Sequence, residues 1–219
     1  MARMSGRGKF ITVEGQDGAG KTTSIRFVER LIRDRNIELL VTREPGGTKL
    51  GEELRRIVLE GHEFQIDSMA ELLMVFAARA QHLSESILPA LSDGVWVLCD
   101  RFTDATFAYQ SGGRGLPREN VESLETLVQQ NLRPDLTLLL DVDIETGRTR
   151  ASQRRQARAD RFESEETGFN NRVRETYLDL ARNHPDRIRI VDASLPLAAV
   201  EEKISGILMR FIGGGEGAQ

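Results

Sequence analysis

The stretch Gly15-Gln16-Asp17-Gly18-Ala19-Gly20-Lys21-Thr22 decides the fold of this 219-residue chain, because it fits the phosphate-binding pattern G-x-x-x-x-G-K-[ST]. Residues 10–13, FITV, come just before it; they are β-branched and aromatic and predict a buried strand. Residues 22–34 follow with apolar side chains at helical spacing. A glycine loop between a strand and a helix is the context that distinguishes a phosphate site from a chance glycine turn.

This loop predicts a site for a nucleoside triphosphate. Glycines let backbone N–H groups wrap around a phosphate, and the N-terminus of the following helix adds partial positive charge. Lys21 is expected to reach the β- and γ-phosphates, and Thr22 is expected to help hold Mg²⁺. The candidate cofactor-binding residues are Gly15, Gln16, Asp17, Gly18, Ala19, Gly20, Lys21, Thr22 and Thr23.

Composition excludes several other classes of protein. The net charge of −4 provides no overall basic field for nucleic acid. No apolar run approaches the roughly 18 to 20 residues that span a bilayer, and residues 1–9 lack the apolar core of a secretory signal. The single Cys99 excludes an internal disulfide and is expected to be a buried thiol. We therefore expect a cytoplasmic protein without membrane or nucleic-acid partners.

Strand and helix patterns alternate along the chain, which predicts an α/β fold with a parallel sheet covered by helices on both faces. The predicted strands are 10–14, 38–42, 95–100, 136–141 and 187–192, and the predicted helices are 22–34, 50–60, 68–91, 118–132, 144–158, 168–181 and 197–209. We expect one domain over 9–212, a flexible N-terminus over 1–8 and a disordered tail over 213–219. Ligands of such folds bind at the carboxyl ends of the strands.

Charged residues follow the second and third strands. Arg43 stands before a Pro-Gly-Gly turn, where it is either a phosphate ligand or an exposed turn residue; the spacing leaves both open. Asp100 ends a buried strand and needs a partner, which is either Mg²⁺ with its water shell or an arginine in a structural ion pair. Arg101 would face the same crevice and meet a phosphate.

The long helix 68–91 carries two polar residues of interest. Arg79 follows an apolar run, so it either extends to solvent or anchors an anion. His82 has no Cys or His near it in sequence, and we interpret it as a polar surface or cap residue.

An arginine-rich segment follows the fourth strand. It is either a solvated helix face, a nucleic-acid patch or a mobile basic lid, and its place after a strand of a P-loop protein favours a lid at about 148–163. Such a lid would neutralise charge on a transferring phosphoryl group. Its arginines are Arg148, Arg150, Arg154, Arg155, Arg158 and Arg161.

Taken together, these segments resemble the thymidylate kinase family. The matching pieces occur in the family's order from about residue 9 to 210: VEGQDGAGKTT, TREPGGT, FAARAQH, DRF with AYQSGGRGLP, RPDLTLLLDVD, DRFE and IVDA. The resemblance implies the three-layer nucleoside monophosphate kinase fold with five parallel strands. It also implies phosphoryl transfer from ATP to dTMP with Mg²⁺, giving dTDP and ADP, and a homodimer.

The resemblance further implies roles for individual residues. Lys21 and Thr22 match ATP- and Mg²⁺-binding positions, Asp100 lies near the metal, and Asp17 matches a contact to the 3′-hydroxyl of dTMP. Arg43, Arg79 and Arg101 match positions that hold the dTMP phosphate. Tyr109 matches an aromatic that favours deoxyribose, Thr106 and Gln110 lie at the thymine edge, Pro45 belongs to the substrate-binding segment, and Asp192 with Ala193 lies beside adenine.

Two details set this chain apart within the family. Its P-loop contains no arginine, as in a bacterial subgroup whose catalytic arginine comes from the lid, so Arg154, Arg155 and Arg158 join Lys21 and Arg101 as catalytic candidates. The family commonly has a Phe four residues before the helix arginine, stacked on thymine, but Val75 stands there and the aromatic is Phe76. One residue rotates a helical side chain by about 100°, so either Phe76 reaches the base at a shifted angle or Val75 packs on it.

Three other functions are less well supported by the sequence. A regulatory GTPase lacks support because no N-K-x-D segment follows the fourth strand. A nucleic-acid-binding ATPase would use the arginine cluster, but the acidic net charge and the lack of interleaved aromatics disfavour it. A kinase for another nucleoside monophosphate is the nearest alternative.

Overall fold

The described residues form one parallel five-stranded sheet in the order β2-β3-β1-β4-β5. A computed structural model describes residues 6–60, 64–153, 162 and 167–213. The predicted α/β class with five parallel strands is confirmed. The strands are β1 Phe10–Gly15, β2 Leu39–Arg43, β3 Trp96–Asp100, β4 Leu136–Asp141 and β5 Ile188–Asp192.

The central position of β1 explains its apolar sequence. Phe10 pairs with Val97 of β3, and Ile11 pairs with Leu136 of β4, so β1 has a hydrogen-bonded neighbour on each side. Both β1 residues are fully buried. A strand covered on both edges and both faces needs a continuous apolar run rather than alternation.

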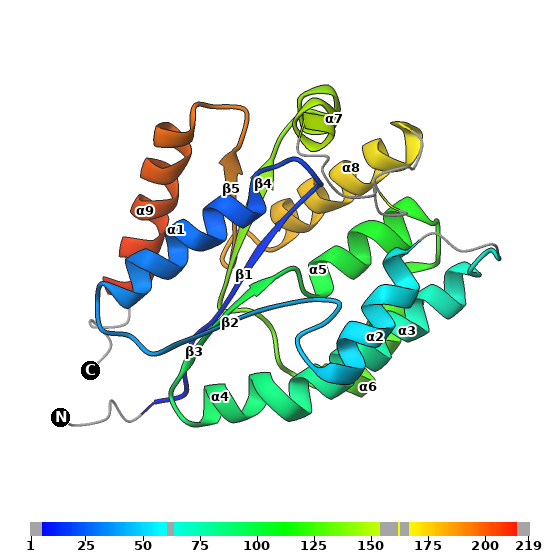
Figure 1. Cartoon of the computed structure of the whole chain (residues 1–219), viewed down its shortest axis with the longest axis horizontal. Helices are drawn as coiled ribbons and strands as arrows, with labels where there is room; N and C mark the ends of the chain where they lie inside the picture. The colour runs from blue at the N-terminus through cyan, green and yellow to red at the C-terminus, as the bar shows by residue number, and fades with distance from the viewer. Residues whose placement is uncertain (1–5, 61–63, 154–161, 163–166, 214–219) are drawn as a thin grey trace.

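Helices cover both faces of the sheet, as Figure 1 shows. On one face α1 and α9 pack against each other and against a core that includes Ile25, Val28 and Ile204. Helices α3, α5, α6 and α8 lie on the opposite side, where α2 packs against α3. The helices are α1 Lys21–Arg33, α2 Lys49–Leu59, α3 Ser68–His82, α4 Leu88–Ser92, α5 Thr103–Thr106, α6 Arg118–Gln129, α7 Ile144–Gln153, α8 Thr167–Asn183 and α9 Leu197–Gly213.

Two π-helical segments depart from the predicted pattern. The predicted helix 68–91 is interrupted by η1 Leu83–Ile87, just before Pro89, which has no N–H to donate. The segment from α5 through η2 Phe107–Gly113 was not predicted at all. It is helical because it packs on α8: a Cβ at Gly112 or Gly113 would come within 2.1–2.4 Å of side chains of that helix. A tertiary contact of this kind leaves no apolar periodicity in the sequence.

Two predicted segments, the tail 213–219 and the helix 144–158, extend beyond the described residues. The expected tail begins at Gly213, which is the last residue of α9. The predicted helix 144–158 is described as far as Gln153. No helix within the described ranges is both long and apolar enough to cross a membrane.

Candidate nucleotide-binding site

The predicted phosphate loop lies between β1 and α1. Gly18 and Gly20 have φ angles of 81° and 92°, in the left-handed region that glycine adopts without strain. A Cβ at Gly18 would lie 2.0 Å from the carbonyl oxygen of Gly147, so the loop packs directly on the backbone of α7. Thr22 and Thr23 are exposed in the first turn of α1. The loop is therefore closed on its α7 side and open at the N-terminus of α1.

Lys21 is buried within the loop, with 8% of its surface exposed. Its Nζ donates to the carbonyl oxygens of Gly15 and Gln16 at 3.0 and 2.9 Å and lies 3.5 Å from Asp17 Oδ1. Burial, followed by the nearby Arg101 guanidinium, lowers the pKa of this ammonium group. Charged phosphate oxygens are stronger acceptors than neutral carbonyls, so a phosphate would compete for the ammonium.

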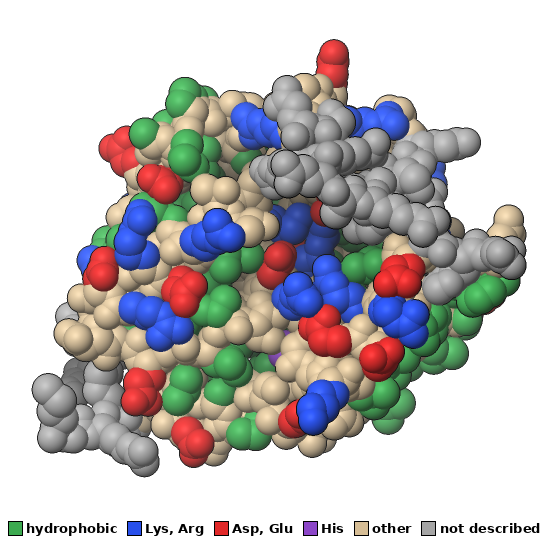
Figure 2. All heavy atoms as spheres, in the orientation of Figure 1, with side chains coloured by type: hydrophobic (Ala, Val, Ile, Leu, Met, Phe, Trp, Pro, Cys, Tyr) green, Lys and Arg blue, Asp and Glu red, His purple; other side chains and the backbone are tan. Residues whose placement is uncertain are grey.

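A cavity of about 270 Å³ opens beside the loop, at the carboxyl ends of β1, β2 and β3. Figure 2 shows Lys and Arg side chains gathered in a hollow in the middle of this face. The cavity brings together most of the predicted site residues: Asp17, Gly18, Gly20, Lys21, Thr22, Pro45, Val75, Arg79, Asp100, Arg101, Thr106, Tyr109 and Gln110.

Arg43, Asp192 and Ala193 do not line this cavity. Arg43 is exposed, and its guanidinium pairs with Glu52 at 2.8 Å, beside a separate open groove. Arg43 is thus the exposed last residue of β2, and its role as a phosphate ligand stays a prediction. Asp192 ends β5 and Ala193 follows it, at the other edge of the sheet.

The helix α3 presents Val75, not Phe76, to the cavity. Val75 is among the lining residues, whereas Phe76 is 2% exposed and lies in the core. The Phe76 ring instead supports Arg79, whose Cζ is 4.7 Å from the ring centroid. A shift of one helical position thus places the aromatic ring of Phe76 against Arg79 instead of in the cavity.

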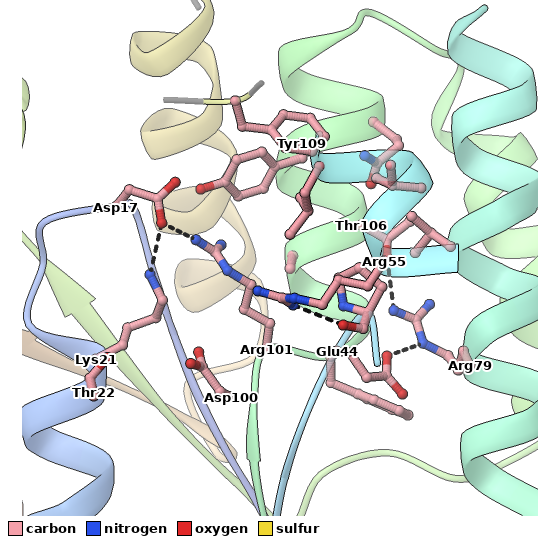
Figure 3. A pocket seen from close by; sticks show the side chains of 18 of the residues that line it. Asp17, Lys21, Thr22, Glu44, Arg55, Arg79, Asp100, Arg101, Thr106 and Tyr109 are labelled. Carbon is pink, nitrogen blue, oxygen red and sulfur yellow. Dashed lines mark hydrogen bonds and ion pairs between the residues drawn. The ribbon is translucent and has the colours of Figure 1, made fainter. Parts of the chain in front are cut away.

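Arg101 lies in the middle of the site (Figure 3). Its backbone is left-handed, with φ of 68°, which is uncommon for a residue other than glycine. Its Nη2 donates to Asp17 Oδ1 at 2.8 Å, its Nη1 donates to Tyr177 Oη at 3.3 Å, and its Cζ lies 4.7 Å from the centroid of the Tyr109 ring. Burial alone would raise the pKa of Asp17, but Arg101 and Lys21 together hold that pKa below its usual value.

Glu14 lies fully buried under Arg101, a role that the sequence did not indicate. One carboxylate oxygen accepts from the backbone N–H of Phe102 at 2.7 Å, and the other accepts from Tyr177 Oη at 2.8 Å. Burial, and then the charge of Asp104, raise the pKa of Glu14 to about 8. Glu14 thus contacts both the backbone that follows Arg101 and the tyrosine that binds its side chain.

Arg79 and His82 belong to a second buried network, so the prediction that His82 is a surface or cap residue is wrong. His82 has no exposed surface; its Nε2 lies 2.7 Å from Thr42 Oγ1 and its Nδ1 lies 3.0 Å from Glu44 Oε1. The other Glu44 oxygen accepts from Arg79 Nε at 2.7 Å, and Arg79 Nη2 donates to Thr106 Oγ1 at 2.9 Å. Among the described residues, none accepts from the buried Arg79 Nη1. Arg79 therefore does not extend to solvent, and one of its donors is available to a ligand.

Asp100 makes no ion pair within the described part of the chain, which argues against the structural Asp–Arg pair considered from the sequence. Its Oδ1 is buried and receives no hydrogen bond from a described residue. A buried, unpartnered carboxylate oxygen is costly unless a cation or a donor occupies the position. Thr22 lines the same cavity.

Only part of the predicted lid can be placed. Arg154, Arg155 and Arg158 lie outside the described residues. Phe162 is buried beside Tyr109, with ring centroids 5.3 Å apart. Arg150 donates from α7 to the carbonyl oxygens of Ala193 and Ser194, at 2.6 and 3.3 Å. The described start of the predicted lid, in α7, is therefore hydrogen-bonded to the loop after β5.

Arg55 is a cavity residue that is absent from the predicted site residues. It extends from α2, and its Nη1 donates to the carbonyl oxygen of Pro45 at 2.8 Å. Burial, and then the charge of Arg43, lower its pKa. Helical spacing offered a signal, because Arg55 stands three residues before the buried Val58, but its exposed neighbour Arg56 looks the same in sequence.

Comparisons with known proteins agree over most of the chain. The family model described as thymidylate kinase matches residues 13–204. The thymidylate kinase of Teredinibacter turnerae is 52% identical over 205 residues, which cover 94% of this chain and 99% of that protein. The thymidylate kinase of Nitrosospira multiformis is 53% identical over 198 residues, or 90% and 95% of the two chains. A crystal structure of thymidylate kinase from Ehrlichia chaffeensis superposes with a TM-score of 0.74 at 32% identity, covering 93% of this chain and 99% of that one.

Proposed function

The chain belongs to the thymidylate kinase family, and from this premise we propose how its residues transfer a phosphoryl group from ATP to dTMP. The enzyme is a phosphotransferase of nucleotide biosynthesis and gives dTDP and ADP. The observation that carries the assignment of residues is a single cavity with the phosphate loop at one end and an unpartnered Arg79 donor at the other.

The ATP phosphates bind at the loop. Backbone N–H groups of the loop and the N-terminus of α1 provide donors, and Lys21 exchanges the carbonyls of Gly15 and Gln16 for the β- and γ-phosphates. Asp192 and Ala193 border the adenine, and the carbonyl oxygen of Ala193 accepts a hydrogen bond from Arg150.

The acceptor phosphate binds beside Arg101 and Arg55. Figure 3 supports this arrangement: Lys21 and Asp17 lie on one side of the view, Arg79 and Thr106 on the other, and Arg101 and Arg55 between them. An arginine fork suits a phosphate dianion. The family resemblance places Arg79 with the phosphate ligands, but its hydrogen bond to Thr106, a residue expected at the thymine edge, favours the base end.

The base end matches a thymine edge. Arg79 Nη1 is a donor without an acceptor among the described residues, and Gln110 donates its own amide nitrogen to Glu71, which leaves Gln110 Oε1 as an acceptor. Thymine presents a carbonyl oxygen, O4, next to its N3–H donor, whereas cytosine presents an amino donor next to the N3 acceptor. Apolar Val75 and the aromatic Tyr109 would line the ring and the deoxyribose.

Catalysis is then a matter of position and charge. The acceptor oxygen of dTMP is already anionic, so no strong general base is required, and the main barrier is repulsion between two polyanions. Lys21, Arg101 and Arg55 all line the cavity, and their positive charges offset that repulsion. Arg154, Arg155 and Arg158 would add charge when a lid closes and excludes water.

Mg²⁺ fits the unpartnered Oδ1 of Asp100, with Thr22 beside it. When bound, the ion would neutralise charge on the β- and γ-phosphates. The described residues contain no cluster of three metal-ligating side chains.

We also propose that the enzyme is a cytoplasmic homodimer. The exposed Leu88 on α4 and Leu127 on α6, which share one shallow apolar groove, support an association surface. Light scattering would measure the mass in solution.

An ADP-release assay tests the function. ATP and Mg²⁺ would be combined with dTMP, dUMP, UMP, CMP, AMP or GMP, and we expect turnover to be fastest with dTMP. A preferred substrate other than dTMP would assign the enzyme to another nucleoside monophosphate. ADP release without any acceptor, stimulated by nucleic acid, would favour the ATPase alternative.

A further inference from the structure

The side-chain amide of Gln110 has a fixed orientation at the base end of the cavity. Gln110 belongs to η2 and is 3% exposed. Its Nε2 donates to Glu71 Oε1 at 2.8 Å, and no described residue donates to its Oε1. Because Gln110 lines the cavity, its carbonyl oxygen is the atom left to meet a ligand there.

Glu71 sets this orientation from outside the cavity. It extends from α3, has no exposed surface and does not line the cavity. Its Oε2 also lies 3.3 Å from Arg114 Nε. An arginine can only donate, so the Glu71 oxygens act as acceptors toward both Arg114 and the Gln110 amide. Turning the Gln110 amide over would place two acceptors against each other in a buried position.

Arg114, the partner of Glu71, is itself packed against two aromatic rings. Its Cζ lies 4.9 Å from the centroid of the Phe169 ring and 5.2 Å from that of Phe162. A guanidinium stacked on two rings keeps its planar fork in one place. The carboxylate of Glu71 thus has a fixed cationic partner on one side and a fixed amide on the other.

We propose that Glu71 is a positioning residue for base selection: by holding the Gln110 amide with its oxygen toward the cavity, it makes the site accept a pyrimidine with an N3–H and reject cytosine, whose N3 is an acceptor. The inference rests on the proposed binding of the thymine edge beside Gln110 and Arg79. A site that pairs with a substrate donor discriminates strongly against an analogue that lacks it, because a buried acceptor is then left unpaired.

The variant Glu71→Gln tests the proposal. It keeps the size of the side chain, but its amide can donate to Gln110 Oε1, so Gln110 can turn its NH₂ toward the cavity. We expect the ratio of kcat/KM for dTMP to that for dCMP to fall by about tenfold or more. The change should combine a higher KM for dTMP with measurable turnover of dCMP, while the KM for ATP stays unchanged.

Glu125→Gln is the matched control. Glu125 is another buried glutamate, 7% exposed, which pairs with Arg133 at 3.1 Å and lies away from the cavity. This variant should keep the wild-type ratio. The proposal would be overturned if the Glu71→Gln enzyme had a native circular dichroism spectrum and an unchanged ratio of kcat/KM for dTMP to that for dCMP.

A measurement on the wild-type enzyme covers the case in which Glu71→Gln does not fold. The monophosphate of N3-methylthymidine lacks the N3–H and should inhibit at least about tenfold more weakly than dTMP binds. Equal binding of the two would show that no acceptor faces N3, and the inference would be wrong even though the enzyme phosphorylates dTMP. Failure of wild-type turnover with dTMP would instead contradict the proposed function.

Discussion

Replacing the buried carboxyl of Glu14 by an amide should change how the stability of the enzyme depends on pH. Burial and the neighbouring Asp104 raise the pKa of Glu14 from 4.5 to about 8. Between these two values the folded protein keeps the proton and the unfolded chain releases it. The stabilisation is complete below pH 4.5 and is lost as the pH rises toward 8, because the unfolded state gains by ionising.

The size of the effect follows from the shift. Each pH unit between 4.5 and about 8 removes about 1.4 kcal/mol from the free energy of unfolding, and the whole interval removes about 4 to 5 kcal/mol. The side chain of the Glu14→Gln variant cannot ionise, so the variant has no such pH-dependent loss in its free energy of unfolding. Any cost of rearranging the contacts to Phe102 and Tyr177 is the same at every pH. The stability of the variant relative to wild type should therefore rise steadily from pH 5 to pH 7.5.

Urea unfolding at pH 5, 6, 7 and 7.5 would measure this difference, with the fluorescence of the single tryptophan, Trp96, as the probe. Glu202→Gln, at an exposed position of α9, serves as the control and should run parallel to wild type. A difference between Glu14→Gln and wild type that stays constant across these pH values would refute the proposed protonation of Glu14.

Three further predictions concern the phosphate loop and the lid. Lys21→Ala should lower kcat by at least about 100-fold with an unchanged circular dichroism spectrum, and near wild-type turnover would remove Lys21 from the mechanism. Gly18→Ala should lose about 1 to 3 kcal/mol of stability and lower Tm, because its φ is 81° and its new Cβ would meet Gly147. Gly115→Ala has a similar φ of 77° but open space around it, so an equal loss there would assign the effect to backbone strain alone. Simultaneous replacement of the lid arginines should reduce kcat far more than dTMP affinity, and equal losses would point to ground-state binding instead; the residues replaced are Arg154, Arg155 and Arg158.

The sheet could be predicted because its signals are local. A central parallel strand is covered on both faces, so a short apolar run such as 10–13 is enough to identify it. The segment Thr103–Gly113 gave no such signal. It becomes helical where glycines let it lie against α8, which is a contact between residues about 60 positions apart.

The same distinction between local signals and tertiary contacts applies to the residues of the candidate site. Lys21 could be named from the phosphate-loop motif, and Asp100 and Arg101 could be named because the carboxyl ends of parallel strands meet at one edge of a sheet. The burial of His82 could not be predicted, because its partners are distant in sequence: Thr42 lies in β2 and Glu44 lies in the loop after it. Nothing in the sequence around Val75 and Phe76 specified which one faces the cavity.

The sequence by itself determined the family, the reaction and the strand-loop-helix unit that binds phosphate, because each is recognised from short motifs whose residues are close together along the chain. Only the tertiary structure decided which groups are buried with which partners. Glu14 meets Tyr177 across 163 positions, and Glu71 meets Gln110 across 39. Protonation of a carboxyl and orientation of an amide depend on the atoms that surround them in space, and those surroundings exist only in the folded chain.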